Sequence, residues 1–412
     1  MTRDEASRQR RADRGKLRLA RAAAFDNVAP GAGDMESIFM RTAICGLLAA
    51  VMIISPATAQ QAGTLISADP VVDTPAGMQA WRIQYWTTTD RNRAIRATGM
   101  VVAPREAMPR EPRNVLAWTH GTWGVASKCA PSLSANFWQV TPALQAVSRG
   151  YTVVAPDYPG LGGEGVHPFL VGVDTGRSVL DAVRAARGIS GAAAGNRVAV
   201  WGESQGGHAA LWTGQLARAY APDLTLVGVA AAAPPTDLIQ NLRLSPNKTV
   251  RALFTAYIGY SWSNHYGAPL TTFGGPQTRG IMTRLAQNVC IELHAKPKLG
   301  TVLGIVTLQS RWKTLDLGRV QPWAGLAQRN SPTTTGFGVP LLIAQNAKDD
   351  LVSPAVTRNH AKALCRSGAR LRWIDIAGDG HATSAKDSAG ATLKWIDDRF
   401  AGQRAPSDCG HF

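Results

Sequence analysis

Cysteine is scarce in this chain, and its spacing argues against a metal site. Five cysteines occur among 412 residues. None of them belongs to a Cys-x-x-Cys pair or has a histidine at ligand spacing, the patterns by which structural zinc sites are recognised. The sequence therefore predicts no bound metal, and no other motif calls for a cofactor.

The apolar run nearest the N-terminus is too short to anchor the chain in a membrane. Residues 42–54 are apolar, but Ser55 and Pro56 end the run well before the roughly 18 residues that a membrane-spanning helix needs. Arg41 precedes the run, and Ala57-Thr58-Ala59 has the small-x-small form of a signal-peptidase site. We interpret residues 1–59 as a leader with a signal peptide that is cleaved after Ala59. The Arg-rich stretch 1–39 is oddly long for such a leader, which makes Met40 a candidate for the true start of translation. The mature protein is then secreted or periplasmic.

Acidic residues are few. The chain has 28 Asp and Glu against 44 Lys and Arg, a net charge of +16. Nine basic and six acidic residues lie in positions 1–59, so the rest of the chain still carries +13. The basic residues are scattered and form no run interleaved with aromatic residues, which argues against nucleic-acid binding. We expect instead an electrostatic attraction to an anionic envelope or lipid surface.

Four cysteines remain after the leader, and an even number in an exported chain predicts two disulfides. Sequence alone allows three pairings of four cysteines. The pairing that we consider joins Cys365 to Cys409, which would tie the C-terminal tail to the body, and Cys129 to Cys290.

Apolar strands alternate with helices along most of the chain, and 45% of the residues are hydrophobic. Such alternation predicts an α/β protein whose mostly parallel sheet is covered by helices on both faces. Thr175 is expected to cap the second helix. The predicted strands are 81–89, 97–102, 114–119, 151–155, 197–201, 224–230, 340–344 and 371–376, and the predicted helices are 137–148, the one from 175, 204–220, 354–365 and 384–400.

The alternation stops between residues 236 and 336. This stretch has helical-looking pieces at 253–260 and 281–293 and no clear buried strand. We interpret 236–336 as a mainly helical cap inserted into a core formed by 60–235 and 337–412.

A Gly-x-Ser-x-Gly motif follows one predicted strand and opens the next helix. It runs from Gly202 to Gly206 with Ser204 at its centre. In a nucleophile elbow the serine occupies a strained turn that exposes its hydroxyl, and the glycines avoid collisions with neighbouring backbone. Ser204 is therefore the predicted nucleophile, against the plainer reading of a helix N-cap serine.

A serine hydroxyl needs a base to remove its proton. His381 follows the last predicted strand on a glycine-containing loop, where the chain order serine, acid, histidine places the base. His120 and His208 fit this order less well: His120 follows a strand before a glycine, and His208 lies one turn beyond the serine.

The acid that orients His381 must lie between the serine and the histidine in the chain. Asp349 follows the strand 340–344 and stands three residues before a valine, so we favour it over the adjacent Asp350. Asp375 and Asp379 are weaker choices because they share a segment with the histidine.

The oxyanion of an acyl-transfer intermediate needs backbone donors. One is expected from Gln205, the residue after the nucleophile, and the other from the glycine-containing loop after the strand 114–119. Thr122 is our choice on that loop, with Trp123 as the second; the alternative is a turn without a ligand role.

Taken together, the motifs resemble those of the secretory lipase family of α/β-hydrolases, which contains enzymes of the yeast lipase A type. The resemblance covers residues 70–400. It implies a serine esterase with a helical cap over an acyl-binding tunnel, acting on lipids or small hydrophobic esters. The motifs are His120-Gly121-Thr122, Cys129-Ala130-Pro131-Ser132, Asp157-Tyr158-Pro159-Gly160-Leu161-Gly162, Gly202-Glu203-Ser204-Gln205-Gly206-Gly207, and the loops of Asp349 and His381.

Three other functions compete with this hypothesis. Residues 160–165 spell Gly-x-Gly-x-x-Gly, but no helix begins inside the motif, as a dinucleotide site requires. A peptidase or amidase would use the same triad, because the triad does not distinguish an ester from an amide. A noncatalytic binding protein that kept the fold is the third.

Overall fold

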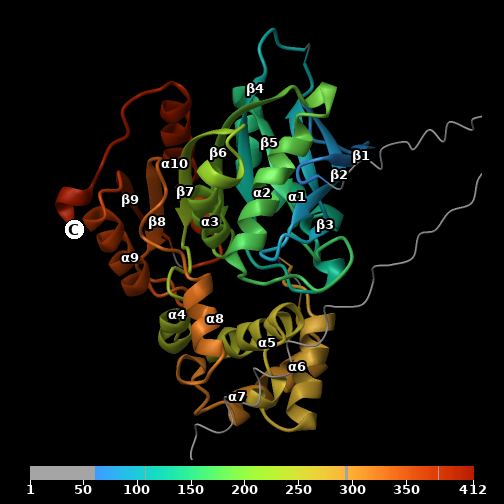
Figure 1. Cartoon of the computed structure of the whole chain (residues 1–412), viewed down its shortest axis with the longest axis vertical. Helices are drawn as coiled ribbons and strands as arrows, with labels where there is room; N and C mark the ends of the chain where they lie inside the picture. Colours follow the sequence, from blue (N-terminus) through green and yellow to red (C-terminus); the bar gives the residue numbers. More distant parts are fainter. Residues whose placement is uncertain (1–60, 107, 293–295, 379) are drawn as a thin grey trace, which may run out of the picture. The chain divides into compact units, whose positions relative to one another are not determined.

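The computed structural model describes residues 61–106, 108–292, 296–378 and 380–412, all within one compact unit (Figure 1). The predicted leader, its apolar run and its cleavage site lie outside the described residues. In the part of the chain that is described, no helix is both long and apolar enough to span a membrane.

Nine strands form one open sheet in the order β1-β2-β3-β5-β4-β6-β7-β8-β9. The pairs from β1 to β5 are antiparallel, and the pairs from β5 through β4 to β9 are parallel. The prediction of a mostly parallel sheet is thus confirmed. The strands are β1 Leu65–Val71, β2 Met78–Thr88, β3 Ala94–Pro104, β4 Arg113–Thr119, β5 Thr152–Pro156, β6 Ala194–Glu203, β7 Thr225–Ala232, β8 Leu341–Asn346 and β9 Leu371–Ile376.

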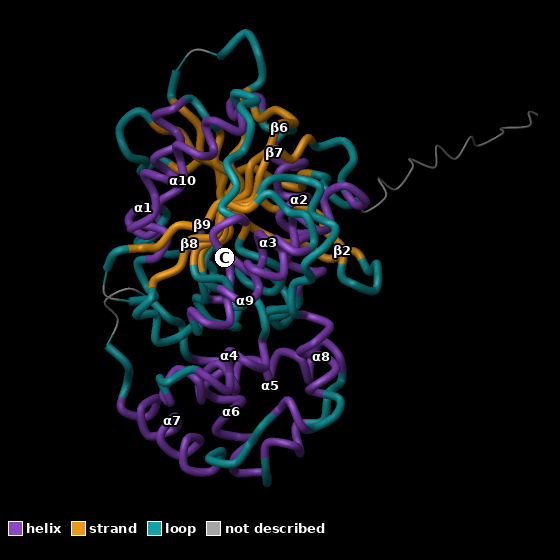
Figure 2. The backbone as a smooth tube through the Cα atoms, turned by 90° about the vertical axis from the view of Figure 1, so that its left-hand side faces the viewer, coloured by secondary structure: helices purple, strands orange, loops and turns teal. Residues whose placement is uncertain are grey.

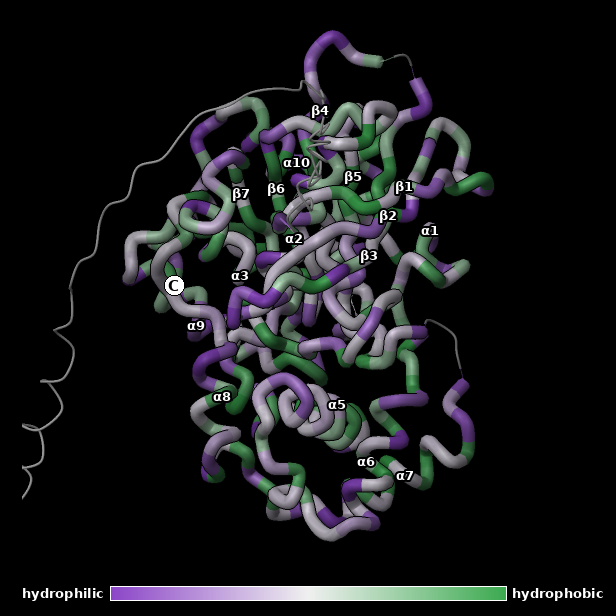
Figure 3. Tube along the Cα trace, turned by 45° about the vertical axis from the view of Figure 1, so that its right-hand side comes forward, coloured by the Kyte–Doolittle hydropathy of each residue, from purple (hydrophilic) through white to green (hydrophobic). Residues whose placement is uncertain are grey.

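Helices cover both faces of the sheet, as Figure 2 shows. Side chains of α2, α3 and α9 share one hydrophobic cluster with the sheet, and those of α1 and α10 share another. Because the central strands are buried on both faces, they are continuously apolar rather than alternating; β5 and β7 contain long hydrophobic stretches in Figure 3. The helices are α1 Phe137–Val140, α2 Gly172–Ala186, α3 Gln205–Tyr220, α9 Pro354–Arg366 and α10 Ser384–Phe400.

The described residues between β7 and β8 contain helices and no strands. Their apolar side chains form a third cluster, in which the rings of Trp262 and Trp323 stack 6.3 Å apart. Trp262 Nε1 also donates to the Phe169 carbonyl (2.8 Å), which attaches this segment to the loop before α2. The helices are α4 Leu238–Leu244, α5 Lys248–Tyr266, α6 Pro276–Asn288, α7 Leu299–Arg311 and α8 Trp323–Asn330.

Several predicted boundaries are wrong. The helix expected at 137–148 is split into α1 and a 3₁₀ helix, Pro142–Arg149, because proline lacks an N–H and disfavours helical backbone at Thr141 before it. The helical piece at 281–293 belongs to α6, which ends at Asn288 because Val289 is extended.

The start of α2 was also misplaced. Thr175 is not its cap: the helix begins at Gly172, and the Thr175 hydroxyl donates to the Val171 carbonyl inside the first turn. Gly172 would normally weaken a helix, but a Cβ there would lie 2.0 Å from the ring of Trp212. Close packing of α2 on α3 therefore overrides the low helix propensity of glycine.

The strand β1 was not predicted. It pairs with β2 at the edge of the sheet, in the antiparallel part, and its side chains are only partly buried. Such a strand lacks the continuous apolar run by which the central strands were recognised.

Two disulfides join distant segments. Cys129, after β4, is bonded to Cys290, after α6. Cys365 in α9 is bonded to Cys409 near the C-terminus. This is the pairing considered above; it ties the helical segment and the C-terminal tail to the rest of the chain.

Candidate active site

Ser204 lies in the sharp turn between β6 and α3. Its φ of 55° and ψ of −120° are values that side-chain-bearing residues rarely adopt, so the surrounding structure must hold this backbone. A Cβ at Gly202 would lie 1.9 Å from Thr119 Oγ1, and one at Gly206 would lie 1.8 Å from the Thr119 carbonyl oxygen. Thr119 of β4 therefore leaves no room for a side chain at either glycine of the motif.

His381 reaches Ser204 from the loop between β9 and α10. Its Nε2 lies 2.7 Å from Ser204 Oγ, and its Nδ1 lies 2.7 Å from Asp349 Oδ2. All three side chains are buried: their exposed fractions are 9% for Ser204, 7% for His381 and 5% for Asp349. The structure thus brings together the three residues that the sequence analysis assigned to the nucleophile, base and acid.

Hydrogen bonds fix the carboxylate of Asp349 behind the imidazole. Its Oδ1 accepts the backbone N–H groups of Leu351 and Val352, both at 2.9 Å, and its Oδ2 accepts the Gln345 amide at 2.9 Å. These donors leave Oδ2 facing Nδ1 of His381, the contact that holds a histidine with Nδ1 protonated and Nε2 free to accept.

The pKa values of the pair move apart. Burial alone would lower the pKa of His381, but the hydrogen bond and charge of Asp349 outweigh it and raise the pKa above the usual 6.5. Burial would raise the pKa of Asp349, but the His381 hydrogen bond and charge, with the two backbone N–H groups, hold it below 3.8. The arrangement stabilises an imidazolium beside an ionised carboxylate, as a general base needs.

Thr122 and Gln205, the expected oxyanion donors, line one cavity of about 50 Å³ together with Ser204. The loop of Thr122 passes close to the nucleophile, since a Cβ at Gly121 would lie 3.8 Å from Ser204 Cβ. Trp123, the second choice, packs in the hydrophobic cluster instead.

The side chains of the remaining alternatives that the structure describes have hydrogen-bond partners other than Ser204. Asp350 is exposed and accepts the Asn247 amide, and Asp375 accepts from Arg358 and Trp373. His120 contacts two backbone carbonyls, of Gly121 and Asp157, while His208 contacts that of Asn330. Asp379 lies outside the described residues.

Three residues near the site were not foreseen. Gln345 donates its side-chain amide to Asp349. Its position near the end of β8, four residues before the acid, could have indicated from the sequence that it lies beside Asp349. His167 accepts the side-chain amide of Gln205 (2.7 Å) and donates to the Pro159 carbonyl (2.9 Å); burial lowers its pKa to about 3, so it remains neutral.

Glu203, directly before the nucleophile, is the third. Its Oε1 accepts the N–H of Ala385 (2.9 Å), and burial raises its pKa to about 7. Its charge adds to that of Asp349 in raising the pKa of His381. Nothing in the sequence motif, in which this position is variable, signals that role.

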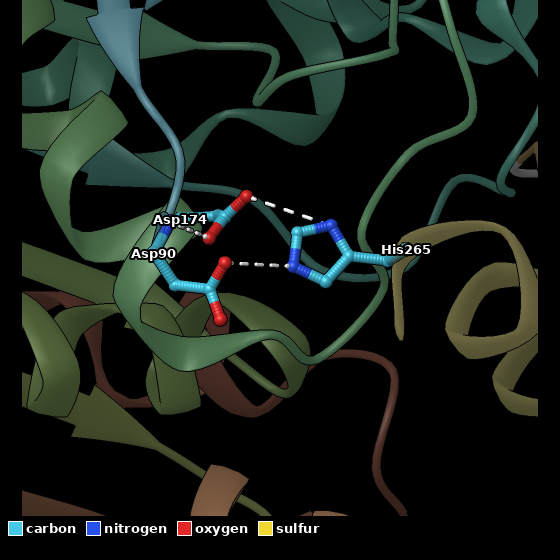
Figure 4. Close-up of side chains that lie close together, drawn as sticks. All are labelled: Asp90, Asp174 and His265. Atoms are coloured by element: carbon cyan, nitrogen blue, oxygen red, sulfur yellow. Dashed lines mark hydrogen bonds and ion pairs between the residues drawn. The ribbon is translucent and has the colours of Figure 1, made fainter. Parts of the chain in front are cut away.

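A second histidine–carboxylate cluster lies elsewhere, and Figure 4 shows it. His265 of α5 places Nε2 3.2 Å from Asp90 and Nδ1 3.8 Å from Asp174 of α2. Among the described residues, this is the group whose donor atoms, all within 4.8 Å, lie close enough to share a metal ion. Arg329 also pairs with Asp90 at 2.8 Å, so the polar contacts of this cluster connect α5 and α8 to the rest of the chain.

The sheet topology, the serine turn and the histidine that follows the last strand define an α/β-hydrolase. Solved structures agree: Candida antarctica lipase A in its closed state matches with a TM-score of 0.70 over 85% of both chains at 21% identity. The model of the secretory lipase family matches residues 132–408, and the chain belongs to that family.

The relatives include proteins named lipases and one named a probable inactive lipase. The chain is 24% identical to a probable inactive lipase of Mycobacterium tuberculosis, over 80% of this chain and 75% of that one. It is 26% identical to lipase 5 of Candida albicans, over 74% and 69% of the two chains. Family membership supports a carboxylic ester hydrolase, either a lipase or an esterase, with lipid esters as the implied substrates.

Proposed function

We propose that this protein is a secreted serine hydrolase that cleaves hydrophobic carboxylic esters through an acyl-enzyme intermediate. The observation that carries the proposal is the continuous hydrogen-bonded chain from Ser204 Oγ through His381 to Asp349, with both contacts at 2.7 Å. A noncatalytic protein that kept the fold would have no need for this chain of hydrogen bonds, so its presence supports the catalytic alternative.

The reaction proceeds in two halves. Ser204 Oγ attacks the carbonyl carbon while His381 Nε2 takes the hydroxyl proton, and the backbone N–H groups of Thr122 and Gln205 bind the oxyanion. The bond to the alcohol oxygen breaks, and His381 returns the proton to the departing alkoxide. Water then attacks the acyl-serine and loses a proton to His381. The bond from the acyl carbon to Ser204 Oγ breaks, His381 returns the proton to Oγ, and the carboxylic acid leaves.

Apolar side chains around the serine favour esters with hydrophobic acyl groups. Leu238 and Leu242 of α4 and Phe254 and Ile258 of α5 line the cavity that contains Ser204. They come from the segment 236–336, which we therefore propose as a cap over the active site. Burial of an acyl chain against them would favour binding by about 0.8 kcal/mol per methylene.

Secretion is part of the proposal. The predicted signal peptide and the two disulfides fit an oxidising compartment, and a relative from Malassezia globosa is named a secreted triacylglycerol lipase. N-terminal sequencing of the exported protein should find a first residue of Gln60.

The test is hydrolysis of p-nitrophenyl esters from acetate to palmitate by the mature protein and its Ser204→Ala variant, with a p-nitroanilide in parallel. We expect ester hydrolysis that is lost with the serine hydroxyl, and the best chain length distinguishes a lipase from a small-ester esterase. Preferred cleavage of the anilide would indicate a peptidase or amidase. Equal activity of both proteins, or none, would contradict the assignment of Ser204.

A further inference from the structure

A second, larger cavity adjoins the one that holds Ser204. It has a volume of about 590 Å³ and lies between α4, α5, α7 and the loop after α7. Leu242 and Arg251 line both cavities, so the two are neighbours and share these side chains as a common wall. An ester with its carbonyl at Ser204 would have to pass Leu242 and Arg251 to place its far end in this second cavity.

The larger cavity is strongly basic. Arg243, Lys248, Arg251 and Lys313 contribute to its wall, against a single carboxylate, Asp316. Arg243 is already paired with Asp316 at 2.9 Å. For Lys248, Arg251 and Lys313, the described residues provide no ion-pair partner. Cations that share one concave wall repel each other unless an anion neutralises them.

Two of these cations lie at the N-terminus of a helix, where the helix dipole is itself positive. Lys248 and Arg251 lie in the first turn of α5, which contains no acidic residue. The positive end of a helix dipole disfavours cations and favours anions at this position. The sequence thus places basic residues where they weaken an isolated helix, a local conflict that is expected at functional sites.

We propose that this cavity binds a negatively charged group, a carboxylate or a phosphate, on an ester whose scissile carbonyl lies at Ser204. The inference rests on the proposed function and specifies its substrates as amphiphilic anionic esters. Arg251, which lines both cavities, is the main contact, and Lys248 and Lys313 add charge. The remaining wall includes Ile239, Leu242 and Val306, which suit the apolar part of such a molecule.

The experiment compares p-nitrophenyl esters of fatty acids whose far end carries a methyl group, a carboxylate or a phosphate, over a series of chain lengths. We expect kcat/KM for at least one anionic series to exceed that of the methyl series by about tenfold, and the preference to shrink with added salt. Which anion gains more identifies the natural group. Equal or lower kcat/KM for both anionic series at every length would overturn the proposal.

Charge-removing variants locate the effect. Arg251→Gln should reduce the anionic-to-methyl ratio of kcat/KM by about tenfold, and Lys248→Gln should reduce it less. Arg218→Gln is the matched control: it removes the same charge from an exposed position near the end of α3, outside both cavities. An unchanged ratio in Arg251→Gln, or an equal fall in Arg218→Gln, would contradict the assignment.

Direct binding separates this inference from the proposed function. The Ser204→Ala variant keeps both cavities but has no nucleophile, so calorimetry can measure its Kd for the carboxylate, phosphate and methyl esters. We expect tighter binding of an anionic ester and its loss in Ser204→Ala/Arg251→Gln. If wild type hydrolyses no ester, the proposed function fails while this measurement still decides the anion site. No preference for the anionic esters would reject that site.

Discussion

Two clusters of this protein each place a histidine between other polar groups, yet their chemistry differs. His381 has Asp349 on one nitrogen and the Ser204 hydroxyl on the other. His265 has carboxylates facing both nitrogens, Asp90 and Asp174. In the first cluster the pKa of the histidine is raised by its partner, whereas in the second burial dominates and lowers it.

The difference shows what a catalytic histidine requires. A general base needs one nitrogen held by an acceptor and the other free to take a proton from the nucleophile. Both nitrogens of His265 face carboxylates, so this histidine has no hydroxyl to activate. Its contacts instead connect α5 to the β2–β3 turn and to α2. The following predictions test this contrast, from the largest effect to the smallest.

Removal of each imidazole should give the largest difference. His381→Ala should lower kcat for ester hydrolysis by roughly 10⁴-fold or more, because no other group can take the serine proton. His265→Ala should retain most of the activity and lose stability, since it leaves Asp90 and Asp174 without the imidazole. Activity assays and thermal unfolding of both variants check this, and comparable losses of kcat would remove the distinction between the clusters.

The two adjacent aspartates provide a matched pair. Asp349→Asn should lower kcat by about 10³- to 10⁴-fold, because the amide no longer holds His381 in the right tautomer. Asp350→Asn changes an exposed side chain whose contact is the Asn247 amide, so kcat should change less than about threefold. Steady-state kinetics distinguish the two, and a larger loss in Asp350→Asn would transfer the role of the acid to that residue.

Asp174 should make stability depend on pH. Burial raises its pKa to about 7 in the folded protein, from 3.8. An acid whose folded-state pKa is raised destabilises the protein as pH rises from the unfolded value to the folded one, here between about 4 and 7. The Tm of wild type should therefore fall over this range relative to Asp174→Asn. Parallel curves of Tm against pH would show that Asp174 does not titrate in this way; Asp350→Asn serves as the exposed control.

Glu203 should have the smallest effect. Because its charge helps to raise the pKa of His381, Glu203→Gln should move the acid limb of the kcat/KM profile to lower pH. A purely structural role would change the height of the profile without moving this limb. A pH series from 5 to 9 on both proteins decides between these outcomes.

Much of the fold could be predicted because its central strands are buried on both faces. Continuous apolar runs such as β5 and β8 stand out from their surroundings, and the position of Ser204 follows from a strand, a motif and a helix in succession. The edge strand β1 could not be predicted, because a half-exposed strand has no continuous apolar run. The start of α2 could not be predicted either, because the glycine at Gly172 is required by Trp212, which is distant in the sequence.

The same limit applies to the sites. Ser204, Asp349 and His381 each follow a strand, and the ends of parallel strands meet at one edge, so their chain order narrowed the choice. Chain order did not separate Asp349 from the adjacent Asp350, which was set aside only on the spacing to a valine. Asp90, Asp174 and His265 lie on a turn and two helices, separated by 84 residues and more in sequence. No local pattern joins such residues, and only the tertiary fold brings them together.

The central claim is that Ser204 is an activated nucleophile. Labelling with a p-nitrophenyl alkylphosphonate tests it most directly. Attack by Ser204 Oγ forms an oxygen–phosphorus bond and releases p-nitrophenolate, which leaves a stable adduct in place of the acyl-enzyme. Intact-mass analysis and peptide mapping should find one adduct per chain, on Ser204, formed rapidly in wild type and far more slowly in His381→Ala. No adduct, or an adduct on another residue, would contradict the account.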